Sequence, residues 1–186
     1  MTMNSIELMV EEHKNIKRML KVVRNACYKV MLGQDINYND FEEMIDFIRI
    51  YADVHHHGKE EKFLFKEMVE HLGSAGKNLI IHGMLVEHDW GRLFISELKA
   101  ALLRVKEGDD ESKLDVLANA VGYANHLGRH IDKEDAVVYT FAEKKLSAEI
   151  MDRVNKQTDS FEDEATKQGT QTHYIKILEE LEGKYL

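Results

Sequence analysis

The segment Tyr51–Phe65, "YADVHHHGKEEKFLF", contains three consecutive histidines followed closely by two glutamates. In a helix, side chains four residues apart lie above one another, so His56 and Glu60 would offer a nitrogen and an oxygen to one small region. The segment is therefore either a solvated polar patch or part of a metal site. A single His-x-x-x-Glu pair is a weak signal of a metal site, so the choice between these two interpretations depends on the rest of the sequence.

A second copy of this segment occurs in the other half of the chain, where "HIDKEDAVVY" starts at His130 and matches "HHGKEEKFLF" from His56. At nearly the same offset, "EHKNIKRML" from Glu12 matches "EHDWGRLFI" from Glu87. Each half of the chain thus contains a histidine and, about 42 residues later, a His-x-x-x-Glu pair. The alignment makes four pairs: His13 with His88, His56 with His130, Glu60 with Glu134, and Phe65 with Tyr139.

Apolar residues recur at helical spacing in four long runs, over about residues 4–32, 38–72, 77–106 and 112–145. The turn-forming stretches "GQDIN", "GSAGK" and "EGDDES" separate these runs. The chain has no proline, 44% hydrophobic and 32% charged residues, which is typical of long helices. Because short loops force neighbouring helices to be antiparallel, we expect an all-α protein built as an up-down-up-down four-helix bundle.

The C-terminal part of the chain continues beyond the fourth run. Ser147 is placed to cap a further helix. After it come the polar stretch "TDSFEDEATKQGTQ" and the amphipathic stretch "HYIKILEELEGKYL". We therefore expect a bundle over residues 1–146 and a short helical extension over residues 147–186 that packs on it.

The net charge of −9 argues against binding to the phosphate backbone of a nucleic acid. The chain has no run of about 18 apolar residues that would predict a membrane span. The first residues, "MTMNSIELMVEEHK", lack the basic start and apolar core of a signal peptide. We therefore expect a cytoplasmic protein with neither nucleic acid nor membrane as a partner.

The predicted helix lengths place the histidines of the repeat at one level of the bundle. His13 lies almost as far before the expected end of the first helix as His56 lies after the expected start of the second. At about 1.5 Å per residue, both are roughly 27 to 29 Å from the loop between them. His88 and His130 lie at matching distances from the corresponding ends of the third and fourth helices.

The two halves supply four imidazoles and two carboxylates to this level: His13, His56, Glu60, His88, His130 and Glu134. If the carboxylates bridge, the set holds two metal ions, each with an open coordination position. These ligands suit iron, manganese or zinc, and the residues alone leave the choice open. Cys27 is the only cysteine, so thiolate clusters are excluded.

The paired "EH" segments, "HHGKEEKFLF" and "HIDKED" resemble the hemerythrin-like HHE cation-binding family over about residues 5–145. The resemblance implies a four-helix bundle with a non-haem di-iron centre, that is, two iron ions joined by an oxo or hydroxo bridge. It also implies that the six residues above are the iron ligands, with Glu60 and Glu134 as bridges. Oxygen-carrying hemerythrins have a His-x-x-x-His pair on the third helix and, on the fourth, a histidine followed five residues later by an aspartate. Here Met84 stands four residues before His88, and Glu134 stands four residues after His130. The site is closer to the four-His, two-Glu subset, which includes iron-cluster repair proteins.

Several neighbouring residues have more than one interpretation. His55 and His57 are rotated by about 100° from His56, which favours rim positions or contacts behind the ligands. Glu61 is expected to be solvated or ion-paired. A register shifted by one residue would replace His56 and Glu60 with His57 and Glu61, but the match of Phe65 with Tyr139 favours the first choice.

The second half contains further open cases. His126 lies four residues before His130 on the same face, so it is a candidate fifth imidazole, although its counterpart Ala52 has no ligand atom. Glu12 and Glu87 are expected to form either surface ion pairs or contacts behind the ligands. Core packing is favoured over a redox or hydrogen-bonding role for Tyr123 and Tyr139. The remaining histidines are expected to be structural or exposed: His71, His82 and His173.

The leading functional hypothesis is a di-iron protein that binds dioxygen, peroxide or nitric oxide, for oxygen or redox sensing or for protection. It leaves open whether the protein is an enzyme, what its oligomeric state is, and whether an electron donor is its partner. One alternative is an enzyme of iron homeostasis or iron-cluster repair. The other is a helical interaction module without a redox role, which the cost of burying six unpaired polar groups argues against.

Overall fold

The computed structural model describes residues 3–186, and within this range it contains helices joined by short connections and no strand. This confirms the predicted all-α class. Four helical rods, each made of one helix or of several helical segments in succession, precede the C-terminal helices. The first rod is the single helix α1 (Ser5–Met31). Asn4 starts it with a capping box: its side chain accepts a hydrogen bond from the backbone N–H of Glu7 at 2.9 Å, while the Glu7 carboxylate accepts one from the backbone N–H of Asn4 at 3.0 Å.

The other three rods each contain several helical segments. The second consists of α2 (Tyr38–Phe47), η1 (Ile48–His57), η2 (Glu60–Leu64) and α3 (Phe65–His71). The third consists of α4 (Gly73–Leu79), η3 (Ile80–Met84) and α5 (Leu85–Lys106). The fourth follows the 3₁₀ turn η4 (Asp110–Ser112) and consists of α6 (Lys113–Lys133), η5 (Glu134–Val138) and α7 (Tyr139–Lys145). The segments η1, η2, η3 and η5 are wide, π-helical turns.

One helix boundary differs from the sequence prediction. The stretch "GSAGK" was expected to separate two helices, but α4 already begins at Gly73, whose φ of +60° turns the chain. Gly76 then lies so close to the preceding helix that a Cβ there would be 2.3 Å from the carbonyl oxygen of Met68. The turn is therefore tighter than the composition suggests, and the helix continues through the remaining residues of the stretch.

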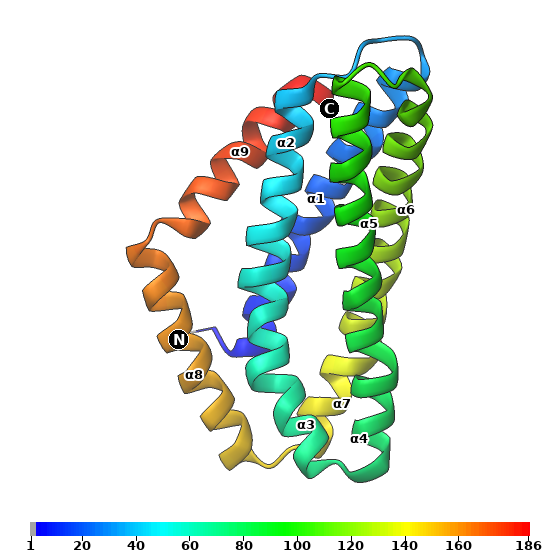
Figure 1. Cartoon of the computed structure of the whole chain (residues 1–186). Helices are drawn as coiled ribbons and strands as arrows, with labels where there is room; N and C mark the ends of the chain where they lie inside the picture. The colour runs from blue at the N-terminus through cyan, green and yellow to red at the C-terminus, as the bar shows by residue number, and fades with distance from the viewer. Residues whose placement is uncertain (1–2) are drawn as a thin grey trace.

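In Figure 1 the four rods lie side by side, with the connections between successive rods alternately at the two ends of the molecule. The C-terminal helices α8 (Ala148–Lys167) and α9 (Thr170–Tyr185) run along one side. α9 contacts α1 and α2, and α8 contacts α1 and η2. Ser147 caps α8 as predicted, accepting a hydrogen bond from the N–H of Ile150 at 3.3 Å. The division into units 1–146 and 147–186 stays a prediction, and its residues 1 and 2 lie outside the described range.

The apolar core is divided into two clusters. One contains Ile16, Tyr51 and Ile95 and extends toward the connection between α1 and α2, and the other contains Met9, Phe65 and Val138 and extends toward α3 and α7. Along every rod, the predicted ligands lie between residues of the first cluster and residues of the second. Each fully buried aliphatic or aromatic side chain contributes about 1.5–3 kcal/mol to the stability of the fold. The two clusters enclose the polar layer that contains the predicted ligands.

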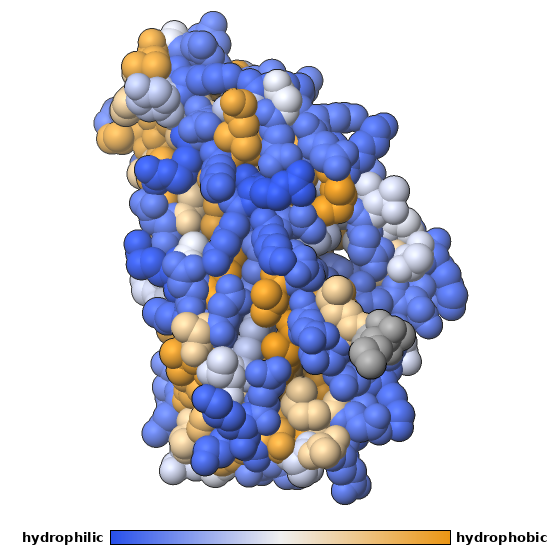
Figure 2. Space-filling view, turned by 180° about the vertical axis from the view of Figure 1, so that it is seen from behind, coloured by the Kyte–Doolittle hydropathy of each residue, from blue (hydrophilic) through white to orange (hydrophobic). Residues whose placement is uncertain are grey.

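The outer surface carries mainly hydrophilic residues. Figure 2 shows this on the face opposite to that of Figure 1, where hydrophobic side chains form smaller groups among hydrophilic ones. Within residues 3–186, no helix combines the length and the apolar character needed to cross a membrane.

Candidate metal centre

The six predicted ligands all lie in the polar layer between the two apolar clusters. Each of them has at most 1% of its surface exposed: His13, His56, Glu60, His88, His130 and Glu134. The rods therefore bring together residues that are far apart in the sequence. Their burial excludes the solvated patch that was the simpler interpretation of the histidine run.

The four histidines direct their Nε2 atoms toward the two glutamates. His13 Nε2 is 3.3 Å from Glu134 Oε2, and His130 Nε2 is 3.0 Å from Glu134 Oε1. His56 Nε2 is 3.7 Å from Glu60 Oε2, and His88 Nε2 is 3.7 Å from an oxygen of each glutamate. Both carboxylates thus face imidazoles from both halves of the chain.

On the outer side, every one of these histidines meets a carboxylate. The Nδ1–oxygen distances are 2.7 Å for His13 with Asp135, 2.8 Å for His56 with Glu12, 2.7 Å for His88 with Glu61, and 2.9 Å for His130 with Glu87. An ionised carboxylate only accepts, so each imidazole donates from Nδ1. Such an outer carboxylate is the usual partner of a metal-binding histidine, because it orients the ring and makes the inner nitrogen more basic.

Several inner atoms are buried without a hydrogen-bond partner among residues 3–186. They are Nε2 of His56, Oε2 of Glu60 and both carboxylate oxygens of Glu134. Buried polar groups in native proteins are nearly always satisfied, because leaving one unpaired costs about 1–3 kcal/mol and more for a charge. Nitrogen and oxygen lone pairs that converge in this way fit a metal cation, and the donor set suits a first-row transition metal.

The pKa values of the two glutamates are shifted in opposite directions. Burial raises the pKa of Glu60 well above its usual range, and the charge of Glu134 raises it further. Burial acts in the same direction on Glu134, but His130 and His13 outweigh it and hold its pKa well below the usual range. Tyr139 donates a hydrogen bond to Glu60 Oε1 at 2.6 Å. The two buried carboxylates therefore differ in their affinity for a proton.

Among the described residues, potential ligand atoms form four groups, and two adjacent groups lie in the polar layer. The atoms within each group lie within 4.8 Å of one another. One group contains His13, His56, Glu60 and Glu134, and the other contains His57, His88 and His130. The six predicted residues thus fall beside two neighbouring positions. That these residues bind metal stays a prediction.

For His57 the sequence interpretation favoured a rim position or a contact behind the ligands, and its burial excludes the rim position. His57 is 5% exposed, and its ring stacks on that of His88 with the centroids 3.9 Å apart. The expectation assumed α-helical rotation, but the histidines end the wide turn η1, where successive residues rotate less. His55 faces the other way, toward Glu12, with Nε2 3.0 Å from its carboxylate. The run of three histidines was the only signal in the sequence.

A buried lysine behind His56 was also missed. Lys59 is 0% exposed and donates to Glu12 and to Glu162 of α8. Glu12 is therefore not on the surface, because it joins His56 to a buried ion cluster. The sequence interpretation had left this contact open as one of two alternatives.

The remaining candidates have other partners. Glu61 is ion-paired, as one expectation held, with Arg92 at 2.7 Å. His126 donates to the backbone carbonyl of Glu87 at 2.7 Å and belongs to neither group of ligand atoms. His82 is exposed, His71 is paired with Glu67 at 3.1 Å, and the ring of His173 packs against Tyr174.

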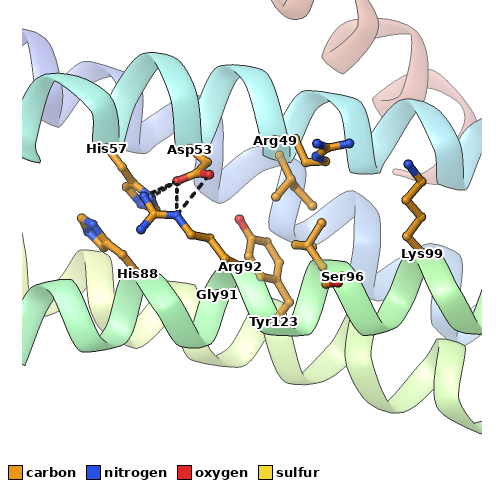
Figure 3. Close-up of a pocket in the computed structure, with 11 residues that line it drawn as sticks. Arg49, Asp53, His57, His88, Gly91, Arg92, Ser96, Lys99 and Tyr123 are labelled. Atoms are coloured by element: carbon orange, nitrogen blue, oxygen red, sulfur yellow. Dashed lines mark hydrogen bonds and ion pairs between the residues drawn. The ribbon is translucent and has the colours of Figure 1, made fainter.

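A cavity of about 410 Å³ opens beside the second group of ligand atoms. Figure 3 shows His57 and His88 at one end and Arg49 and Lys99 toward the other. Between them, Arg92 binds Asp53 with its Nη2 at 2.7 Å from Oδ1. The cavity therefore extends from the exposed residues Arg49 and Lys99 to the two histidines.

Comparison with protein families adds independent support for a metal centre. Residues 4–142 match the family model described as the hemerythrin HHE cation binding domain. The matched range includes all six predicted ligands and ends before α8. A search of curated proteins found no match.

Proposed function

Because the chain belongs to the hemerythrin HHE cation-binding family, we propose that it is a cytoplasmic non-haem di-iron protein that binds dioxygen, peroxide or nitric oxide. Its role would be oxygen or redox sensing, or protection. The four rods then correspond to the up-down-up-down bundle expected for such a protein. The observation that carries the proposal is the convergence of buried lone pairs of His56, Glu60 and Glu134 that make no hydrogen bond within residues 3–186.

Six residues would hold the metal: His13, His56, Glu60, His88, His130 and Glu134. The two glutamates lie among imidazoles from both halves, which suits them as bridges between two ions. When bound, iron supplies a reversible change of oxidation state and an open coordination position for a small ligand. The outer carboxylates keep the imidazoles oriented, and Tyr139 holds one oxygen of Glu60 by its hydrogen bond.

Apolar side chains control access to the centre. Phe65 and Met84 on one side and Leu127 on the other are at most 3% exposed and limit the entry of water. The cavity beside His57 and His88 is the proposed route for small ligands. In this proposal an electron donor completes the redox cycle.

A second candidate function is iron homeostasis or iron-cluster repair. It is favoured by Met84, which is buried at the position where oxygen carriers have a histidine and which offers no imidazole. Repeated turnover with a reductant would support this enzymatic role. A purely stoichiometric spectral change would support a binder or a sensor.

The test is the metal content of the full chain after expression with iron, together with its ultraviolet-visible spectrum. We expect about two irons per chain and charge-transfer bands that disappear on reduction. His56→Ala should lower the iron content, whereas His82→Ala, at an exposed histidine, should not. Well under one iron per chain, with no effect of His56→Ala, would refute the proposal.

A further inference from the structure

We propose that His57 is a fifth histidine ligand and completes the metal position beside the cavity. The inference rests on the proposed function and deepens it, since it assigns a metal ligand outside the set of six. It starts from the grouping of ligand atoms, in which His57, His88 and His130 lie within 4.8 Å of one another. All three are buried.

His57 repeats the arrangement of the other four histidines. Its Nδ1 lies 3.4 Å from Oδ1 of Asp53, so a carboxylate again stands on the outer side of the ring. Asp53 is in turn held by Arg92, which donates from Nε at 3.0 Å and from Nη2 at 2.7 Å. This leaves Nε2 of His57 as the nitrogen available to a metal, as in the other four rings.

The wide turn η1 explains how neighbouring residues serve neighbouring positions. In an α-helix, His57 would be rotated about 100° away from the face of His56. The π-helical turn rotates less per residue and so keeps both histidines directed inward, and π-helical turns recur at functional sites. His56 belongs to one group of ligand atoms and His57 to the other.

The second half of the repeat has no equivalent residue. The counterpart of His57 is Ile131, a buried member of the apolar core. The two metal positions are therefore unequal: His13 and His56 serve one, and His57, His88 and His130 serve the other. Both share the glutamates. The position with more nitrogen is the one beside the cavity, and it should favour the later divalent metals of the first transition row.

The experiment titrates the chelator-treated full chain with Co²⁺, following heat and the visible ligand-field spectrum. His57→Phe keeps an aromatic ring against His88 and removes both nitrogens, and His57→Gln provides a second variant with a polar side chain. His126→Phe is the control, because His126 stacks near His130 but lies outside both groups. Circular dichroism and urea unfolding check that each variant is folded.

We expect wild type and His126→Phe to take up two Co²⁺ per chain. Both His57 variants should keep one Co²⁺ at wild-type affinity and bind the second at least about 10-fold more weakly, with part of the spectrum lost. Asp53→Asn should weaken the same ion by a smaller factor. Two ions with unchanged affinity and spectrum in His57→Phe would overturn the inference.

The test also separates this inference from the proposed function. If His56→Ala loses Co²⁺ while both His57 variants behave as wild type, the centre stands and only the fifth ligand is rejected. If wild type itself binds no Co²⁺ and no iron, both proposals are rejected.

Discussion

The two halves of the repeat build the same contact in different surroundings. In the first half, Glu12 binds His56 and Lys59, and in the second half Glu87 binds His130 and Lys133. The alignment makes these residues counterparts. Lys59 is nevertheless 0% exposed, whereas the side chain of Lys133 is 52% exposed.

The difference comes from a segment outside the repeat. Helix α8 covers the first half, where Glu162 gives Lys59 a second carboxylate and the ring of Phe161 lies 5.9 Å from Nζ. Lys133 is open to solvent instead. The repeat therefore determines which residues meet, and the C-terminal extension determines how dry the contact is and how much it contributes to stability.

The largest expected effect is the loss of the covered lysine. Lys59→Met should destabilise the metal-free protein by about 3–5 kcal/mol, because it removes the lysine charge from buried Glu12 and half-buried Glu162. Lys133→Met is the matched control and should change stability by less than about 1 kcal/mol. Urea unfolding measures both. Equal effects would break the distinction between a covered and an open half.

The second effect is a difference in pH dependence between the matched histidines of the metal-free protein. Burial and His13 lower the pKa of His56 to about 4. Burial also opposes the charge on His130, but Glu134 and Glu87 outweigh it and raise its pKa to about 9. His130 therefore stabilises fully below its ordinary 6.5 and loses this contribution as the pH rises through 9. His56 stabilises fully above 6.5 and loses it as the pH falls through 4.

His130→Gln should thus flatten the alkaline fall in stability, and His56→Gln the acid fall. Each histidine accounts for at most about 1.4 kcal/mol per pH unit. Urea unfolding of chelator-treated protein between pH 4 and pH 9 measures both limbs. If each variant kept the wild-type profile, the two halves would not differ electrostatically.

A third, smaller effect concerns the cover itself. Glu162→Gln removes the charge that α8 provides to Lys59 and should cost about 1.5–3 kcal/mol, since hydrogen bonds to charged groups are worth this much. Amide hydrogen exchange should show faster opening of α8. Glu164→Gln, at an exposed position of the same helix, should leave both stability and exchange unchanged. Equal exchange rates in the two variants would show that the ion pair does not hold the helix.

The smallest effect tests another asymmetry of the repeat, the pairing of Phe65 with Tyr139. Tyr139→Phe removes the hydrogen bond to Glu60 and should cost about 1 kcal/mol in thermal or urea unfolding. Tyr123→Phe provides a control at a buried tyrosine away from both glutamates and should cost less. A larger effect at Tyr123 would assign the stabilisation to packing rather than to the hydroxyl of Tyr139.

Sequence periodicity was sufficient to predict the helical rods and the level of the bundle at which the predicted ligands meet. Residues such as His13 and His88 could be found because the repeat and the regular helical rise are both local properties. The burial of His57 was not predicted, because a wide turn changes the rotation per residue without changing composition. The burial of Lys59 could not be predicted, because its partner Glu162 lies 103 residues away in a segment without a counterpart in the repeat.

The pairing of Lys59 with Glu162 also bears on the order in which the molecule matures. A chain is synthesised from its N-terminus, so the four rods leave the ribosome before α8 is complete. Until Glu162 has followed, Glu12 is the only carboxylate paired with Lys59. The surroundings of His56 are therefore completed only after all four rods have been synthesised.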